Sequence, residues 1–259
     1  MRRHLEETIT RVTGSRPIRS QLMSGGCVGD VRWVTLEDGS AVVAKTGDKG
    51  SGLDLEGFML RYLRDTGGLP VPDVLFADDG VLLMSFIETS GGISPGAQSE
   101  AADLLAALHG VEAEAFGFER ATVIGGLPQP NPSTKSWVKF FRDHRLLYMA
   151  RQALDAGRLP AVLMGRLETL AGRLGGWLTE TARPSLIHGD MWTGNVLCNH
   201  GRISGFVDPA VYYADAEIEL AGPRSIRRVA ADDFFRDLFT TALEADEGLA
   251  SIRVRPAGP

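Results

Sequence analysis

The sequence predicts an α+β fold of two lobes, a small antiparallel β-sheet that carries one helix and a larger, mainly helical lobe. Three observations predict it. Residues 1–88 hold short β-forming runs around one amphipathic helix, residues 89–259 are mostly of helical periodicity, and 44% of the 259 residues are hydrophobic. A chain of this length and composition can bury a sizeable core. We therefore expect the two lobes to meet near residue 88.

The first lobe begins with a predicted hairpin. Residues 31–36 and 41–46 are rich in β-forming side chains, and the Glu-Asp-Gly-Ser segment between them is a turn signal. An amphipathic helix follows, because apolar residues recur at helical spacing at Leu55, Phe58, Met59, Tyr62 and Leu63. Glycines and prolines between residues 67 and 72 end that helix, and the apolar run 81–86 predicts the strand that closes the lobe.

The second lobe follows a linker, residues 89–96, which is rich in glycine and serine. Helical periodicity then marks three segments, by leucines at 104–108, by aromatic residues at 137–148 and by leucines at 163–178. Residues 125–132 contain three prolines and two glycines, which predicts a long loop without regular structure. Two short strand-like runs, 196–198 and 203–207, turn near Gly201.

Composition excludes several classes of protein. The formal charge is −6 and no basic stripe is visible, which argues against a nucleic-acid partner. Two cysteines cannot form the disulfide framework of a small secreted domain. No segment approaches the roughly 20 apolar residues that span a bilayer. The first residues turn acidic after two arginines, unlike a secretory signal, so we expect a cytoplasmic protein without a membrane partner.

The chemistry is predicted by the run 185–197, which contains the pattern H-x-D-x-x-x-x-N at His188, Asp190 and Asn195. This is the spacing of a kinase catalytic loop. Phosphoryl transfer needs a carboxylate to accept or orient a hydroxyl proton, here Asp190, and oxygen ligands for Mg²⁺, here Asn195 and the later Asp208. Each residue alone would be interpreted as a turn, cap or surface residue, but together they predict phosphoryl transfer. We interpret His188 as a structural histidine that braces the loop.

The first lobe supplies the expected nucleotide contacts. Lys45 ends a strand, in the manner of the kinase lysine that meets the α- and β-phosphates, and Glu56 on the next helix is placed to pair with it. A solvated surface pair is the alternative interpretation. The backbone of Ser85, Phe86 and Ile87, where the last strand ends, is expected to bind the adenine edge of ATP.

A glycine-rich turn precedes the hairpin, and its Gly25, Gly26 and Cys27 are expected to cradle phosphates through backbone N–H groups. The turn departs from G-x-G-x-x-G, so an ordinary turn is the alternative. The Cys27 thiol, near N–H groups and Lys45, is a redox candidate whose oxidation would impair nucleotide binding, through a Cys27–Cys27 link between two chains. The alternative is that a small residue merely fits the turn.

Several further motifs carry a resemblance to a known family. The chain resembles the fructosamine kinase (ketosamine-3-kinase) family from about Gly25 to Ala221. Most specific are D-P-A-x-Y-Y at residues 208–213 and P-Q-P-N-P at residues 128–132. The other matching segments are residues 188–197, Ala107-Leu108-His109, Phe116-Gly117-Phe118, Trp137 with Phe140-Phe141, and Arg145-Leu146.

The resemblance implies a protein-kinase-like fold, related to that of aminoglycoside phosphotransferases, which uses ATP and Mg²⁺. It implies phosphorylation of a sugar hydroxyl of a ketosamine on an amine or a protein lysine, and with it deglycation. Residues 1–88 would bind the nucleotide, and residues 89–259 would hold the catalytic and substrate groups. Trp192 would pack against the sugar, with a core tryptophan as the alternative, and Glu217 would be a further substrate residue.

The sequence departs from the family pattern after Ala221. Residues 222–259 open with Gly-Pro and an arginine-rich stretch, which is poor material for a buried helix. We expect either a reading-frame change or a divergent native ending. In both cases we expect a large lobe that is incomplete at its C-terminus, an exposed apolar patch near the substrate side, and marginal stability or a homodimer that covers the patch.

Three hypotheses on function therefore stand. The first is a ketosamine kinase, and the second is a kinase of the same fold that acts on an aminoglycoside, choline or homoserine. The third is a nucleotide-binding protein with little turnover because of its atypical C-terminus.

Overall fold

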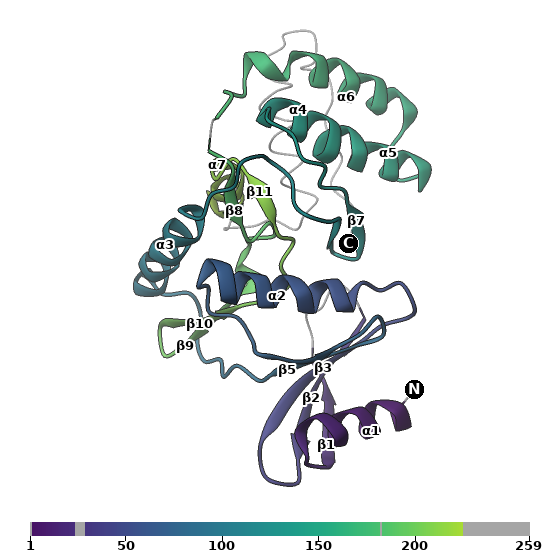
Figure 1. Cartoon of the computed structure of the whole chain (residues 1–259), viewed down its shortest axis with the longest axis vertical. Helices are drawn as coiled ribbons and strands as arrows, with labels where there is room; N and C mark the ends of the chain where they lie inside the picture. The colour runs from purple at the N-terminus through teal and green to yellow at the C-terminus, as the bar shows by residue number, and fades with distance from the viewer. Residues whose placement is uncertain (1, 24–28, 182, 225–259) are drawn as a thin grey trace, which may run out of the picture.

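The structure, a computed structural model, describes residues 2–23, 29–181 and 183–224 (Figure 1). The small lobe is one antiparallel sheet with the strand order β1-β2-β3-β5-β4. Its strands are β1 (Pro17–Leu22), β2 (Asp30–Leu36), β3 (Ala41–Thr46), β4 (Val74–Ala77) and β5 (Val81–Ser85). The predicted hairpin is confirmed as β2–β3, and the α+β class is confirmed as well.

The sheet carries two helices rather than the one that the sequence predicted. Helix α1 (Arg2–Thr13) packs on one face, and α2 (Leu53–Gly67) packs on the other (Figure 1). Neither α1 nor β1 was predicted. Helix α1 buries few apolar residues amid many charged ones, and β1 is an edge strand whose side chains are almost all exposed. The apolar residues of α1, Leu5, Ile9 and Val12, recur at helical spacing but are only three, and five of the six residues of β1 are exposed.

The large lobe is mainly helical, and Figure 1 shows α4, α5 and α6 at the end of the molecule away from the sheet. Its helices are α3 (Pro95–His109), α4 (Trp137–Phe141), α5 (Leu147–Asp155), α6 (Ala161–Arg173) and α7 (Glu217–Arg224). A π-helical turn, η1 (Arg142–Leu146), joins α4 to α5, and α6 continues into the 3₁₀ turn η2 (Leu174–Gly176). A further 3₁₀ turn, η3 (Thr193–Asn195), follows the H-x-D sequence.

Among the residues that the structure describes, the large lobe also holds three small two-stranded ribbons. Strand β8 (Ser185–Ile187) pairs with β11 (Tyr212–Ala214), β9 (Val196–Asn199) pairs with β10 (Arg202–Phe206), and β6 (Thr122–Ile124) pairs with β7 (Leu127–Gln129). The expected turn of β9–β10 near Gly201 is confirmed: His200 and Gly201 both have positive φ, 49° and 76°. This is the twist that a two-residue hairpin loop requires.

The prediction that residues 125–132 lack regular structure was wrong. Gly125 and Gly126 have φ of 53° and 78° and form the tight turn of the β6–β7 hairpin. Pro128 lies within β7, opposite Val123. A proline is tolerated there because both strands of a two-stranded ribbon are edges, so the missing N–H group interrupts no central strand.

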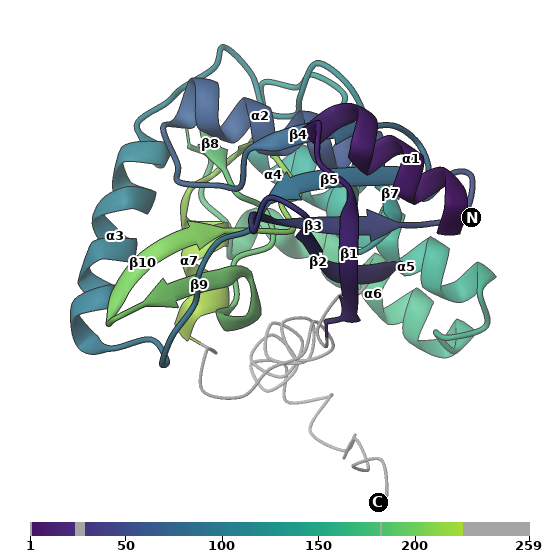
Figure 2. The same cartoon turned by 90° about the horizontal axis from the view of Figure 1, so that it is seen from below.

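Helix α2 belongs to two cores at once. Its Leu53 and Leu60 pack with Leu82 and Met84 of the sheet. Its Met59 and Leu63 lie in a second core together with residues of the large lobe, which include Leu105, Leu108, Leu186, Met191 and Phe206. Figure 1 shows α2 between the sheet and the large lobe, and Figure 2 shows the molecule from the side of the sheet. The helix therefore joins the two lobes through buried side chains.

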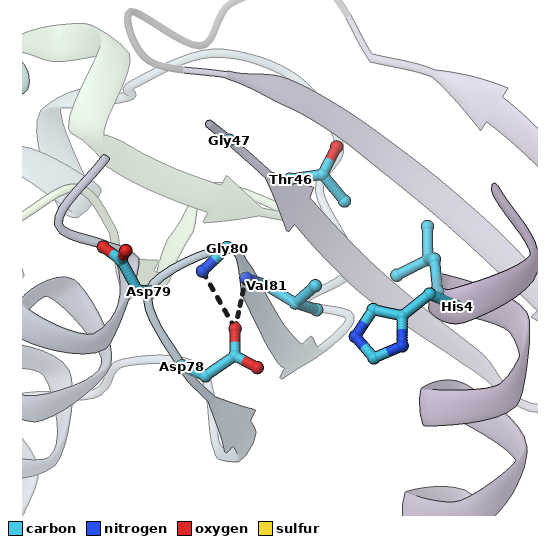
Figure 3. A pocket seen from close by; sticks show the side chains of 8 residues that line it. His4, Thr46, Gly47, Asp78, Asp79, Gly80 and Val81 are labelled. Atoms are coloured by element: carbon cyan, nitrogen blue, oxygen red, sulfur yellow. Dashed lines mark hydrogen bonds between the residues drawn. The ribbon is translucent and has the colours of Figure 1, made fainter. Parts of the chain in front are cut away.

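A pocket of about 360 Å³ opens between α1 and the turn from β4 to β5 (Figure 3). Its lining includes His4, Thr46, Asp78 and Asp79. Asp78 holds the turn, since its Oδ1 accepts from the N–H groups of Gly80 and Val81. Because neighbouring side chains of a strand point to opposite faces, Thr46 lines this pocket on the face opposite to Lys45.

In the described residues, no helix is long and apolar enough to cross a bilayer.

We predict that Met59→Ala and Leu60→Ala each lower the free energy of unfolding by about 2–5 kcal/mol, because each leaves a cavity in one of the two α2 cores. Urea denaturation measures both values. Thr66→Ala on the exposed side of α2 is the control and should change stability by less than about 0.5 kcal/mol. A loss below about 1 kcal/mol for either core variant would show that the corresponding face of α2 is not packed.

Candidate active site

Three predicted residues from distant parts of the chain meet between the lobes. The Lys45 ammonium on β3 is 2.6 Å from Oε1 of Glu56 on α2 and contacts Oδ1 of Asp208, which follows β10. Only 8% of the Lys45 side chain is exposed. Burial alone would lower the pKa of Lys45, but the two carboxylates outweigh burial and hold that pKa above its ordinary value. Lys45 is therefore charged, and its charge is shared between the two lobes.

Asp208 has an unusual backbone. Its φ of 55° lies in the left-handed region, which costs a residue other than glycine free energy and persists only where the surroundings enforce it. The bonds on either side enforce it here: the N–H of Val207 donates to the carbonyl oxygen of Asn195, and the N–H of Ala210 donates to that of His188. In this conformation the Asp208 carboxylate contacts Lys45, and the Asp208 carbonyl oxygen accepts from Nδ2 of Asn195 at 3.5 Å.

Asp190 and Asn195 are joined directly. Asn195 Nδ2 donates to the Asp190 carbonyl oxygen at 2.7 Å and to its carboxylate Oδ2 at 3.0 Å. Both amide hydrogens are thus used within the loop, and the amide oxygen of Asn195 is left to serve as a ligand. Burial raises the pKa of Asp190, and the hydrogen bond from Asn195 offsets part of that rise.

His188 is completely buried and contacts the loop with both ring nitrogens. Nε2 donates to the carbonyl oxygen of Val207 at 3.1 Å, and Nδ1 accepts from the N–H of Asp190 at 3.4 Å. Burial lowers the pKa of His188, and one donating and one accepting nitrogen is the pattern of a neutral imidazole. These contacts agree with the interpretation of His188 as a bracing residue between Asp190 and the Asp208 turn.

Glu219, on α7, is a residue that the sequence motifs did not indicate. Its buried carboxylate accepts from the backbone N–H groups of His188 at 3.2 Å and Gly189 at 2.7 Å, and it lies 2.8 Å from Nε2 of His109 on α3. The sequence held two signals, an acidic residue within the apolar segment 217–221 and the motif residue His109. Their partners could not be predicted, because the contacts span 30 residues and more.

Gly189 and Ala210 bring the H-G-D loop and the turn that contains Asp208 into contact. Gly189 has a φ of 87°, and a Cβ atom there would overlap the carbonyl oxygen of Ala210. Glycine is therefore required at this position. The backbones of the H-G-D and D-P-A segments thus lie in direct contact at Gly189 and Ala210.

The remaining predicted residues lie around this centre. Ser85 ends β5, where its N–H and hydroxyl both bond the backbone of Asp73, and Phe86 and Ile87 continue into the linker. The Trp192 side chain is 40% exposed and lies over Gly194, so it is not a core tryptophan. Glu217 is exposed on α7 and stays a prediction. Outside the described residues lie Gly25, Gly26, Cys27 and residues 225–259 of the atypical tail.

The oxygen groups fit a magnesium ion that is completed by phosphates. The Asp208 carboxylate and the Asn195 amide are hard oxygen donors, as Mg²⁺ prefers. Within the part of the chain that the structure describes, no three His, Cys, Asp or Glu side chains gather closely enough to hold a metal by themselves. Mg²⁺ is commonly bound by one or two protein oxygens with the rest from substrate phosphates and water, so this donor set is suited to a metal that arrives with a nucleotide.

The fold and site together define the class. A buried lysine from a sheet, paired with a glutamate on the following helix and facing an Asp–Asn loop and a second aspartate, is the arrangement of the protein-kinase-like fold. A sequence model of the fructosamine kinase family matches residues 1–246. The chain therefore belongs to the fructosamine kinase family. The match begins before Gly25 and continues past Ala221, a longer span than the motifs indicated.

Individual relatives agree with this assignment. A probable ketoamine kinase of Synechocystis is 40% identical over 121 residues, 45% of this chain and 39% of that protein. The chloroplastic protein-ribulosamine 3-kinase of Oryza sativa subsp. indica is 29% identical over 225 residues, 83% of this chain and 63% of the relative. The chain thus spans less than two thirds of the length of these relatives. The solved structure of a fructosamine-3-kinase candidate from Thermobifida fusca is 28% identical, with a TM-score of 0.75 over 95% of this chain and 86% of that chain.

We predict that Glu219→Gln lowers the free energy of unfolding by about 1–3 kcal/mol, because one amide oxygen cannot satisfy the donors that the carboxylate accepts from. Glu217→Gln, two residues earlier on the same helix but exposed, is the matched control and should stay within about 0.5 kcal/mol of the parent chain. Urea denaturation of both variants is the measurement. Equal effects of the two substitutions would contradict the role of Glu219 in holding the loop.

Proposed function

We propose that this protein is an ATP- and Mg²⁺-dependent kinase that phosphorylates a sugar hydroxyl of ketosamines, the fructosamine or ribulosamine adducts of amines or protein lysines, and so serves deglycation. The observation that carries the proposal is the meeting of Lys45, Asp208, Asn195 and Asp190 in a chain of the fructosamine kinase family. The names of the relatives, ketoamine kinase and ribulosamine 3-kinase, support the substrate class. A cytoplasmic location and a homodimer stay predictions.

Each residue has a defined task in this reaction. The Asp190 carboxylate accepts or orients the proton of the acceptor hydroxyl as oxygen attacks the γ-phosphate. The charged Lys45 binds the α- and β-phosphates, and Glu56 holds it in place. Asn195 and Asp208 would hold Mg²⁺, which when bound neutralises phosphate charge. Ser85, Phe86 and Ile87 would bind the adenine edge, with Gly25, Gly26 and Cys27 at the phosphates.

Trp192 supports a sugar as the acceptor. The indole lies on the catalytic loop two residues after Asp190, and it is exposed over Gly194 rather than buried in the core. An exposed aromatic face beside the proton acceptor is suited to pack against the apolar side of a sugar ring. Gly194 permits this placement, because a Cβ atom there would overlap the indole ring.

Product analysis with labelled ATP tests the proposal. The acceptor panel is fructosyl-lysine, ribulosyl-lysine, the unmodified sugars, an aminoglycoside, choline and homoserine. We expect labelled product with one or both glycated lysines and none with the unmodified sugars. Transfer to the aminoglycoside, choline or homoserine instead would show a related small-molecule kinase. Tight binding of Mg·ATP without product from any acceptor would show a nucleotide-binding protein with little turnover.

We predict that Asp190→Ala lowers the rate of phosphoryl transfer by about 10²–10⁴-fold and leaves ATP binding largely intact. The reason is that Asp190 acts on the acceptor hydroxyl and not on the nucleotide. Turnover with labelled ATP and binding by calorimetry are measured on the same preparation. Near-normal turnover of the purified variant would refute the assignment of Asp190 as proton acceptor.

We predict that Asp208→Asn weakens binding of Mg·ATP itself, since the variant loses the carboxylate that would hold the metal. The measurement is the thermal shift that ATP with Mg²⁺ produces, because a ligand that binds only the folded state raises its stability. The shift should shrink in Asp208→Asn and persist in Asp190→Ala. An unchanged shift in Asp208→Asn would count against the metal role.

A further inference from the structure

The P-Q-P-N-P sequence has no role in the reaction described so far, yet its polar side chains are buried. Gln129 is 1% exposed and Asn131 is 5% exposed. A buried amide is retained where its hydrogen bonds are made, because an unpaired one is costly. The partners of these two amides therefore indicate what the motif does.

Gln129 is bonded to the turn that contains Asp208. Its Nε2 donates to the carbonyl oxygen of Ala210 at 3.1 Å and to Oγ1 of Thr122 at 3.0 Å. Thr122 is the cross-strand partner of Gln129 in the β6–β7 hairpin, and its hydroxyl donates to the carbonyl oxygen of Val211 at 3.3 Å. The hairpin thus bonds two successive carbonyl groups, which directly follow the Asp208-Pro209 pair.

The far side of the motif is held by Arg145. Its guanidinium donates to the carbonyl oxygen of Pro130 at 2.8 Å and to Oδ1 of Asn131, and it lies 3.9 Å from the centre of the Tyr212 ring. The π-helical turn η1 carries Arg145, and only 8% of this residue is exposed. Asn131 in turn donates to Oγ1 of Thr122 at 2.8 Å. A continuous buried polar chain therefore runs from Arg145 to the Ala210 carbonyl.

The Ala210 carbonyl lies at the point where these buried hydrogen bonds reach the active site. The same carbonyl is the group that excludes a Cβ atom at Gly189, and the N–H of Ala210 donates to the carbonyl oxygen of His188. Asp208, two residues earlier, keeps a left-handed backbone that needs support from its surroundings. Without the Gln129 amide, a buried carbonyl would lose its side-chain donor next to this strained turn.

We propose that Gln129 is a positioning residue that fixes the Asp208 turn through the Ala210 carbonyl, with Asn131 and Arg145 as its anchor. This inference rests on the proposed function, in which Asp208 of that turn would hold the Mg²⁺ that arrives with the nucleotide. Gln129 acts through the backbone and does not touch the reacting groups. Its loss should therefore weaken metal-dependent binding selectively, and binding of the nucleotide without metal should be retained.

The test compares binding of ADP with Mg²⁺ and of ADP with EDTA by calorimetry. Gln129→Met keeps the length and removes the donor. We expect Mg·ADP to bind about tenfold more weakly, which is the lower end for lost outer-shell support of a metal site, and metal-free ADP to bind within about twofold of the parent chain. If Gln129→Met does not fold, Gln129→Asn, which keeps an amide but withdraws it by one methylene, is measured instead.

Ser136→Ala is the control for lost stability. The Ser136 hydroxyl accepts from the N–H of Lys139 at the start of α4 and donates to Oε1 of Glu180, so its removal should lower stability and leave Mg·ADP binding unchanged. Equal weakening of ADP with and without metal by the Gln129 variant would show a general structural role and overturn the inference. Unchanged binding would overturn it too. Absence of metal-dependent ADP binding in the parent chain would instead refute the proposed function.

Discussion

The structure of the site depends on one buried cation. The Lys45 ammonium is shared by Glu56 of the small lobe and Asp208 of the large lobe. Removing either carboxylate would leave buried charge poorly compensated, which is far more costly than losing a surface ion pair. Because the partners come from β3, α2 and the turn after β10, this charge cluster requires the correct placement of three elements at once. The same requirement places Asp208 beside Asn195 and Asp190.

The rest of the large lobe supports that placement along the backbone. Glu219 holds the N–H groups of the H-G-D sequence, Gln129 holds the carbonyl of the D-P-A sequence, and the two segments touch where Gly189 has no side chain. The catalytic side chains are thus presented by backbones that are bonded on several sides. The polar groups that do this work are buried and satisfied, as preorganised sites require.

The sequence was sufficient for the elements with strong periodicity and for the residues with fixed spacing. It predicted α2, the β2–β3 hairpin and the H-x-D-x-x-x-x-N residues, because each is defined by neighbours within a few positions. It was insufficient for α1, β1 and the β6–β7 hairpin, where few apolar residues or several prolines obscure the pattern. Glu219 was missed for another reason: its donors lie at positions 109, 188 and 189, and only the folded chain brings them together.

The two cores of α2 have a thermodynamic consequence. Unfolding the sheet alone would uncover Met59 and Leu63 and leave a void among the residues of the large lobe that they contact. Unfolding the large lobe alone would expose the same side chains from the other side. Neither lobe can therefore melt while the other keeps its full stability, so denaturation should proceed as one cooperative transition across both lobes.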